Sequence, residues 1–134
     1  MGIDRIAPMV DIAASGLRAQ SLRLNLIAGN IANAETTRTV TGEPYRRKTV
    51  VLRTTGDGLG GVTVLNIERD MSAFRQVLMR GHPDADEDGF VLMPNVDLPV
   101  EMMNLTAASR AYEANLAVLK RYQDIVETTV ELLR

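Results

Sequence analysis

The chain has 134 residues, a length that suits one ordinary domain. Its 15 basic residues nearly balance 17 acidic ones, so no strong field favours nucleic acid or an anionic membrane. The absence of cysteine excludes disulfides, thiolate nucleophiles and cysteine metal sites. No apolar run approaches the roughly 18 residues of a membrane span. The first residues lack the features of a cleaved secretory signal, so we expect none.

The N-terminal part predicts a helix over residues 6–33. Apolar residues recur there at alternating spacings of four and three, broken only at Gln20, as in a helix that packs against another helix. Gly16 and Gly29 lie inside this helix, where each costs about 1 kcal/mol relative to alanine. We expect both glycines to permit the close approach of a second helix, with a helix kink as the alternative.

The polar middle of the chain predicts a small β region. Residues 45–52 and 62–67 have strand patterns, and a glycine-rich turn over residues 54–61 separates them, which favours a β-hairpin. Residues 70–79 indicate a short linker or single helical turns. Because a two-stranded ribbon is marginal in water, we expect the hairpin to pack on another element.

The acidic stretch over residues 81–97 resembles part of a calcium loop. Asp84, Asp86 and Asp88 match the first half of the D-x-D-x-D-G pattern, but Asn95 stands where the bidentate glutamate belongs. We therefore expect an acidic turn followed by an extended segment. Calcium binding, or a metal site that includes the lone histidine His82, is the alternative.

The remaining motifs give little support to catalysis or nucleic-acid binding. Arg46, Arg47 and Lys48 form one basic triplet without interleaved aromatic residues, so we expect solvated or partner-facing charges, with nucleic-acid binding as an alternative. The sequence has no G-x-S-x-G motif and no phosphate-binding loop. We expect no enzyme activity, no cofactor, no metal and no small-molecule substrate.

The C-terminal part predicts a second helix over residues 98–133. Residues at alternating spacings of four and three are again mostly apolar, and the mean spacing of 3.5 residues is typical of helices wound around each other. At 1.5 Å per residue this helix would be roughly 54 Å long, more than so small a chain can cover. The apolar stripe comprises Leu98, Met102, Leu105, Ser109, Tyr112, Leu116, Leu119, Gln123, Val126, Val130 and Leu133.

These patterns together predict a mainly α protein with a small β region. Residues 1–36 and 98–134 would form an antiparallel, coiled-coil-like pair of terminal helices, and residues 37–97 an extended or β-hairpin segment. A monomeric helical hairpin with a β cap is one interpretation. Since that arrangement leaves much apolar surface on both helices, we favour an assembly that completes the packing.

Four segments carry a resemblance to a known family. They are ASGLRAQSLRLNLIAGNIANAETT over residues 14–37, PYRRKTVVL over 44–52, GHPDADEDGFVLMPNVD over 81–97 and ASRAYEANL over 108–116. The chain resembles the axial proteins of the bacterial flagellum, and in particular the short rod proteins of the proximal basal body. The resemblance covers most of the chain, and the segment over residues 81–97 is the most specific part.

The resemblance implies a structural subunit of the flagellar rod in the periplasmic basal body. Its terminal helices would line the inner tube of a helical lattice, which transmits torque and forms part of the export channel wall. Its expected partners are further copies of itself, other rod proteins and the flagellar export apparatus, which would secrete the chain without a cleaved signal. The expected interface residues are Leu17, Leu24, Ile27, Asn30, Ile31, Asn33, Leu105, Tyr112, Asn115, Leu116, Leu119 and Val126.

Overall fold

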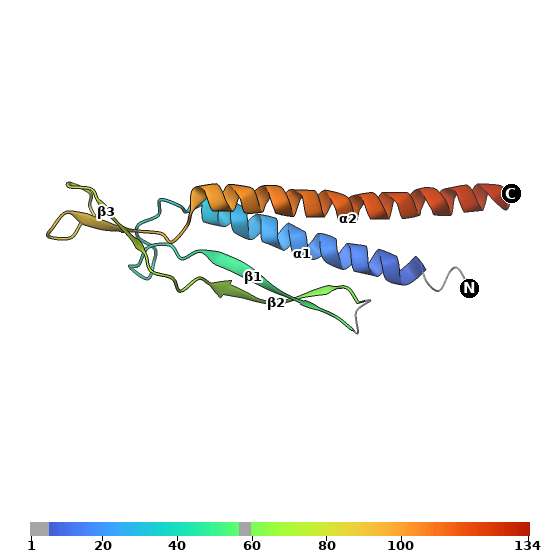
Figure 1. Cartoon of the computed structure of the whole chain (residues 1–134), viewed down its shortest axis with the longest axis horizontal. Helices are drawn as coiled ribbons and strands as arrows, with labels where there is room; N and C mark the ends of the chain where they lie inside the picture. Colours follow the sequence, from blue (N-terminus) through green and yellow to red (C-terminus); the bar gives the residue numbers. More distant parts are fainter. Residues whose placement is uncertain (1–5, 57–59) are drawn as a thin grey trace.

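The structure is a computed structural model that describes residues 6–56 and 60–134. The molecule is elongated, and two long helices lie side by side in opposite directions (Figure 1). Helix α1 spans Ile6–Ala32 and helix α2 spans Leu98–Leu132. The first turn of α1 and the last turns of α2 point toward one end of the molecule, and a small β-hairpin lies at the other (Figure 1). The predicted antiparallel pair of terminal helices is thus confirmed.

The larger β element is the hairpin predicted after the first helix. Strand β1 (Lys48–Thr54) pairs antiparallel with β2 (Val62–Arg69), and the register shifts between Val51 and Leu52. The ribbon packs against α1, as expected for a pair of strands that cannot stand alone. Residues 57–59, which include Gly58 of the predicted turn, lie outside the described residues.

A second hairpin corrects the prediction for residues 70–79. Strand β3 (Arg75–Leu78) lies in this segment, which is therefore neither a plain linker nor a set of helical turns. It pairs antiparallel with β4 (Phe90–Met93), and Val77 lies directly opposite the buried Val91. The pairing is non-local, so a pattern only four residues long could not indicate it. The acidic turn followed by an extended segment is confirmed.

Hydrogen bonds of capping side chains explain where α2 begins and where α1 ends. Asp97 caps α2, because its side chain accepts a hydrogen bond from the Val100 N–H at 3.2 Å, and Pro99 suits the first turn. At the end of α1, the Asn33 side chain donates to the Gly29 carbonyl at 2.8 Å and accepts from the Thr36 hydroxyl at 3.2 Å. Asn33 therefore acts as an ordinary stop for the helix.

Small side chains bring the two helices together. Gly16 of α1 faces Asn115 of α2, and a Cβ atom at Gly16 would lie 2.8 Å from the Asn115 amide nitrogen. The expected close approach is therefore confirmed at Gly16. At Gly29 it is wrong, because the nearest atom to a Cβ there is the Tyr45 hydroxyl at 3.9 Å. The buried apolar side chains of the pair are Ala13, Ala19, Ile27 and Ala108.

In the first turns of α2, the residues that face the interior of the molecule differ from the predicted apolar stripe. Glu101 and Ala108 are buried, and Asn115 continues the line at the same spacing of seven residues. Leu98 and Met102, which belong to the predicted stripe, are consequently exposed. At its other end α2 extends past the first turn of α1 (Figure 1). Among the described residues, neither helix is long and apolar enough to cross a membrane.

The contact between Gly16 and Asn115 predicts an energetic coupling. Gly16→Ala gains up to about 1 kcal/mol of helix propensity, but it must displace the Asn115 amide, which donates to the Ala111 carbonyl at 2.9 Å. In an Asn115→Ala background the obstacle is gone, so Gly16→Ala should stabilise the protein by about 1 kcal/mol. Urea unfolding of the parent, both single variants and the double variant measures this difference.

Gly29→Ala is the matched control for this comparison. Its Cβ would meet only the Tyr45 hydroxyl at ordinary contact distance. It should therefore have the same effect with or without Asn115. If Gly16→Ala also had equal effects in both backgrounds, the proposed close contact between the helices would be wrong.

Candidate assembly site

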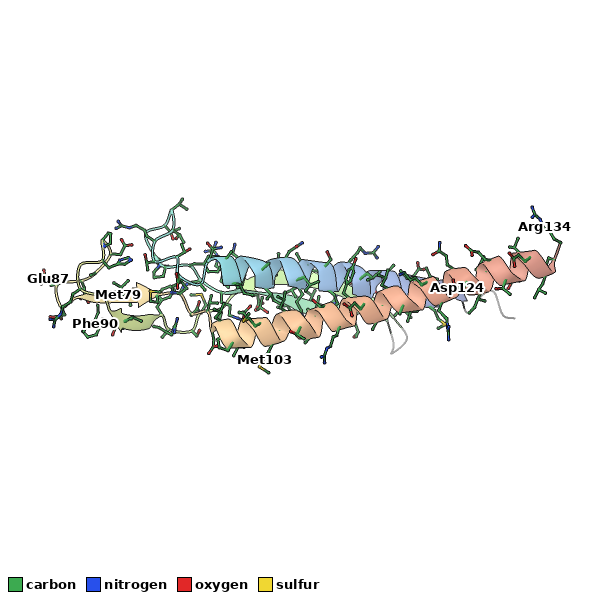
Figure 2. The ribbon with its side chains drawn as sticks, turned by 90° about the horizontal axis from the view of Figure 1, so that it is seen from above. Met79, Glu87, Phe90, Met103, Asp124 and Arg134 are labelled. Atoms are coloured by element: carbon green, nitrogen blue, oxygen red, sulfur yellow. The ribbon has the colours of Figure 1, made fainter. Side chains whose placement is uncertain are left out.

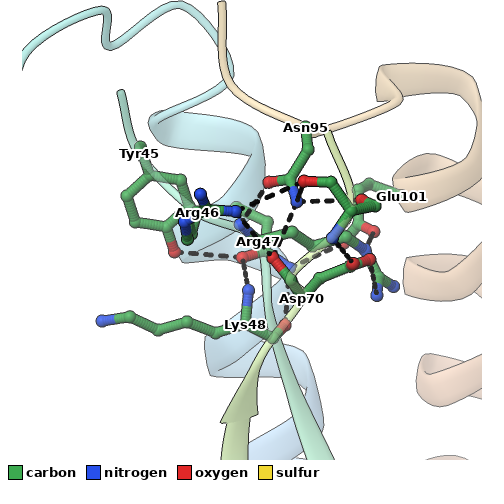
Figure 3. Close-up of polar contacts among 9 residues, drawn as sticks. Tyr45, Arg46, Arg47, Lys48, Asp70, Asn95 and Glu101 are labelled. Carbon is green, nitrogen blue, oxygen red and sulfur yellow. Dashed lines mark hydrogen bonds and ion pairs between the residues drawn. The ribbon is translucent and has the colours of Figure 1, made fainter. Parts of the chain in front are cut away.

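A cluster of polar side chains joins the end of α1, the start of β1 and the start of α2 (Figure 3). We call this cluster the junction. It takes side chains from both helices and from the segments that lead into β1 and α2. Its members are Asn30, Tyr45, Arg47, Asn95 and Glu101.

Asn30 is fully buried and uses every hydrogen-bonding position of its amide. Its Nδ2 donates to the Lys48 carbonyl at 2.9 Å and to Glu101 Oε2 at 3.0 Å. Its Oδ1 accepts from the Lys48 N–H at 2.9 Å and from the Tyr45 hydroxyl at 3.0 Å. The amide thus pairs with Lys48 as a neighbouring strand would, and it fastens β1 to α1.

Glu101 brings a carboxylate into the interior of the junction, where it is fully buried. The Arg47 Nε lies 2.6 Å from its Oε1, while Asn30 occupies its Oε2. The Arg47 guanidinium also lies 3.9 Å from the Asp70 carboxylate. Because a buried charge is tolerated only when it is paired and hydrogen-bonded, these contacts hold the start of α2 in one position.

Asn95 extends the junction to the segment that precedes β3. Its Oδ1 accepts from the Arg47 N–H at 2.8 Å, and its Nδ2 donates to the Asp70 carbonyl at 2.8 Å. The Ser72 N–H donates to the Asp70 side chain at 2.9 Å, and this bond lowers the pKa of the Asp70 carboxyl. The loop before β3 is therefore tied to both β1 and the approach to α2.

The basic triplet was expected to carry solvated or partner-facing charges. This expectation is wrong for Arg46 and Arg47, whose side chains are bound within the chain. Arg47 is bound within the junction, as described above. The Arg46 guanidinium lies 4.1 Å from the centre of the Phe74 ring and donates to the Ser72 carbonyl at 3.3 Å. These contacts within the chain occupy both guanidinium groups, because the 70–74 segment folds back over the start of β1.

The acidic stretch is likewise used for structure. Asp84 accepts a hydrogen bond from the Thr37 hydroxyl at 2.8 Å, and Asp86 accepts from the Phe90 N–H at 2.7 Å. The His82 Nδ1 accepts from the Asp84 N–H at 3.1 Å. Over residues 6–56 and 60–134, no three acidic, histidine or cysteine side chains are grouped so that they could hold a metal ion.

The predicted interface residues have several different environments. Asn30 is buried, and the four hydrogen bonds of its amide are made within its own chain. Asn33 ends α1, Asn115 covers Gly16, and Val126 is exposed. Ile27 is buried, and the other apolar members are half-buried: Leu17, Leu24, Ile31, Leu105, Tyr112, Leu116 and Leu119.

Sequence patterns did not indicate that Arg47 and Glu101, the two central charges of the junction, are paired. Glu101 was available as a signal, because a glutamate seven residues before Ala108 lies on the same inner line of a helix. A charge at such a position requires a buried partner. Which of the three consecutive cations supplies it depends on the fold of β1 and cannot be read from spacing.

The buried pair predicts that Arg47 and Glu101 are strongly coupled. Arg47→Met should cost about 3–5 kcal/mol, since it leaves the Glu101 carboxylate buried without a cation. In a Glu101→Gln background no charge is left unpaired, so Arg47→Met should cost about 1–3 kcal/mol less. Urea unfolding of the four proteins gives the coupling.

Arg53→Met is the control for the loss of an arginine from β1. Arg53 is exposed, so this change should cost less than about 0.5 kcal/mol. Strictly additive losses from Arg47→Met and Glu101→Gln would contradict the role that we assign to the pair.

The junction also predicts an alkaline dependence of stability. Burial, together with the charge of Glu101, raises the pKa of Tyr45 above its usual 10.0. The associated stability is therefore fully present below pH 10 and is lost as the pH rises through the pKa of the folded state. Tyr45→Phe should flatten this alkaline fall in unfolding free energy, and it should cost about 1 kcal/mol at neutral pH through the lost hydrogen bond.

Thermal or urea unfolding from neutral to alkaline pH tests this prediction, with Tyr122→Phe near the other end of α2 as the control. An alkaline slope that Tyr45→Phe leaves unchanged would show that Tyr45 is not the responsible group.

Comparison with known proteins places this architecture in a family. The family model "Flagella basal body rod protein" matches residues 11–38, and "Flagellar basal body rod FlgEFG protein C-terminal" matches residues 87–132.

The chain is 39% identical to the flagellar basal-body rod protein FlgC of Agrobacterium fabrum, with 98% of each chain covered. It is 45% identical to FlgC of Yersinia enterocolitica, covering 91% of this chain and 93% of that protein. FlgC of Bacillus subtilis is 34% identical, with 92% and 95% covered. These matches give no support to the calcium or the nucleic-acid alternative, and the chain belongs to the FlgC family of flagellar basal-body rod proteins.

Proposed function

We propose that this rod subunit assembles with copies of itself and with other rod proteins through its two terminal helices. Membership of the FlgC family makes the chain a structural protein of the flagellar basal body and not an enzyme. The subunits would follow a helical lattice whose inner tube is formed by α1 and α2. The β region would then lie on the outside of this tube.

One observation carries the proposal, namely the exposed apolar face at the end of α2. Ile125 is 55% exposed and Val130 is 57% exposed, although both occupy apolar positions of an amphipathic helix. Charged side chains such as Asp124 and Glu127 occupy the opposite face. The exposed apolar side chains of this region, which we call the α2 end face, are Val118, Ile125, Val126, Val130, Leu132 and Leu133.

A contiguous apolar face of this kind favours burial against another molecule. Burial contributes about 25 cal/mol per Å² of apolar area, without requiring directional contacts. The face lies at one end of an elongated molecule (Figures 1 and 2). A contact between it and a different surface of a neighbour would be heterologous, and heterologous contacts that do not close build filaments.

We also propose where the subunit lies in the flagellum and that it transmits torque. The subunit would lie in the proximal, periplasmic part of the rod, where it would transmit torque and form part of the export channel wall. It would arrive through the flagellar export apparatus as an unfolded chain without a cleaved signal. This part of the proposal follows the family resemblance, and the stiff polar junction between helices and strands is compatible with a load-bearing role.

Val126→Asp tests the proposed role of the α2 end face. Val126 is 40% exposed, so the charge should alter the stability of the monomer by no more than about 0.5 kcal/mol. In an assembled rod the same charge would be buried without a partner, which is costly. We expect a strain with this variant as its sole copy to lose motility and complete rods, which electron microscopy of isolated basal bodies can measure.

Thr128→Asp is the matched control, since it places the same charge on the polar side of the same exposed turns. It should leave motility and rod length unchanged. Normal rods with Val126→Asp, made from protein of normal abundance, would show that the α2 end face is not an assembly contact.

A further inference from the structure

Two cations lie directly opposite each other at the base of the larger hairpin. Lys48 of β1 and Arg69 of β2 are partners in the antiparallel register, so their side chains share one face of the ribbon. Like charges in this position are destabilising. Among the residues that the structure describes, the ion pairs include neither Lys48 nor Arg69. The Lys48 ammonium lies 5.8 Å from the centre of the Tyr45 ring, and no carboxylate of the described residues forms an ion pair with either cation.

These two cations line a pocket of about 220 Å³ on the surface of the hairpin. Arg46 also lines it, and the hydroxyls of Thr39 and Thr41 lie 2.8 Å apart on the loop at its edge. Of the three cations that line the pocket, Arg46 forms an ion pair, with the Glu43 carboxylate at 3.9 Å. Lys48 and Arg69 give this pocket a positive charge, which is the chemistry that binds carboxylates.

A complementary acidic surface lies in the β3–β4 region of the same chain. Residues 70–97 contain six acidic and two basic side chains. Glu87 and Asp88 are exposed in the turn between β3 and β4, which ends at Gly89 with a φ of 86°. Figure 2 shows Glu87 at the end of the molecule farthest from Arg134. Within the described part of the chain, neither acid forms an ion pair.

We propose that the pocket of Lys48 and Arg69 receives the carboxylates of Glu87 and Asp88 from a second copy of this chain. The two surfaces have opposite charge, and within the described residues neither the two cations nor the two acids form an ion pair. Because they are different surfaces, their contact is heterologous and repeats from copy to copy without closing. This inference rests on the proposed rod assembly and adds to it a directional contact outside the helix pair.

Charge reversal tests the contact from both sides. Arg69→Glu alone, or Glu87→Lys with Asp88→Lys, should reduce complete rods and motility about tenfold or more, because each places like charges together. A single strain that adds Lys48→Glu to these three substitutions should recover both properties, because the pocket is then acidic and the turn basic, so that the attraction is restored with its sign reversed. Arg53→Glu, the same charge change at an exposed position of β1, is the control and should have no effect.

Several outcomes would overturn the inference. One is normal assembly by either one-sided variant, and another is failure of the fourfold variant, which includes Lys48→Glu, while circular dichroism shows it folded. A defect in Arg69→Glu without one in Glu87→Lys with Asp88→Lys would assign the pocket to another rod protein. Binding of DNA that Arg69→Glu abolishes, with rods unaffected, would assign it to nucleic acid. If the unmodified chain built no rods in the same strain, the proposed function itself would fail.

Cross-linking gives an independent measurement, because the chain has no cysteine of its own. Two differently tagged copies, one with Arg69→Cys and one with Glu87→Cys, should form a disulfide between the tags in isolated basal bodies. Arg53→Cys with Glu87→Cys is the control and should not cross-link. Absence of the heterotypic cross-link in rods that contain both tagged copies would contradict the contact.

Discussion

The buried carboxylate of Glu101 is the constraint on which the rest of this structure depends. It lies in the first turns of α2, on the side of the helix that faces α1, and it is tolerable only with a cation and a hydrogen-bond donor in contact. Arg47 and Asn30 supply them from β1 and α1. The requirement to satisfy one charge therefore fixes three elements at a common point, and the long arms of the helices extend from there.

Away from the junction, the helix pair is held by different means. Its buried apolar side chains are mostly alanines, and Gly16 lets the Asn115 side chain lie close against α1. Such a contact brings the backbones together but buries little apolar area on each side chain. Larger apolar side chains of α2 remain at the surface, most of all in the α2 end face. The fold thus leaves the apolar side chains of the α2 end face available for association.

Sequence patterns were sufficient for the elements that satisfy local rules. The four-three spacing predicted both helices, and the alternation around the glycine-rich turn predicted β1 and β2. The same rules failed for β3, because four residues acquire strand structure only through pairing with β4. They also failed for Arg46 and Arg47, which look solvent-exposed in a basic triplet. Whether a charge is buried depends on distant partners, here Phe74 and Glu101, and spacing does not encode these.

The distribution of polar and apolar contacts separates two requirements of a rod subunit. Hydrogen bonds and ion pairs in a buried site are directional, and a misaligned partner leaves a costly unpaired group, so the junction can specify a single angle between helices and strands. Apolar burial is non-directional and tolerates small shifts. Neighbouring subunits in a loaded filament need association that survives such shifts, whereas each subunit must keep its own shape. It follows that the polar network belongs inside the chain and the apolar face outside it, which is the arrangement found at Asn30 and at the α2 end face.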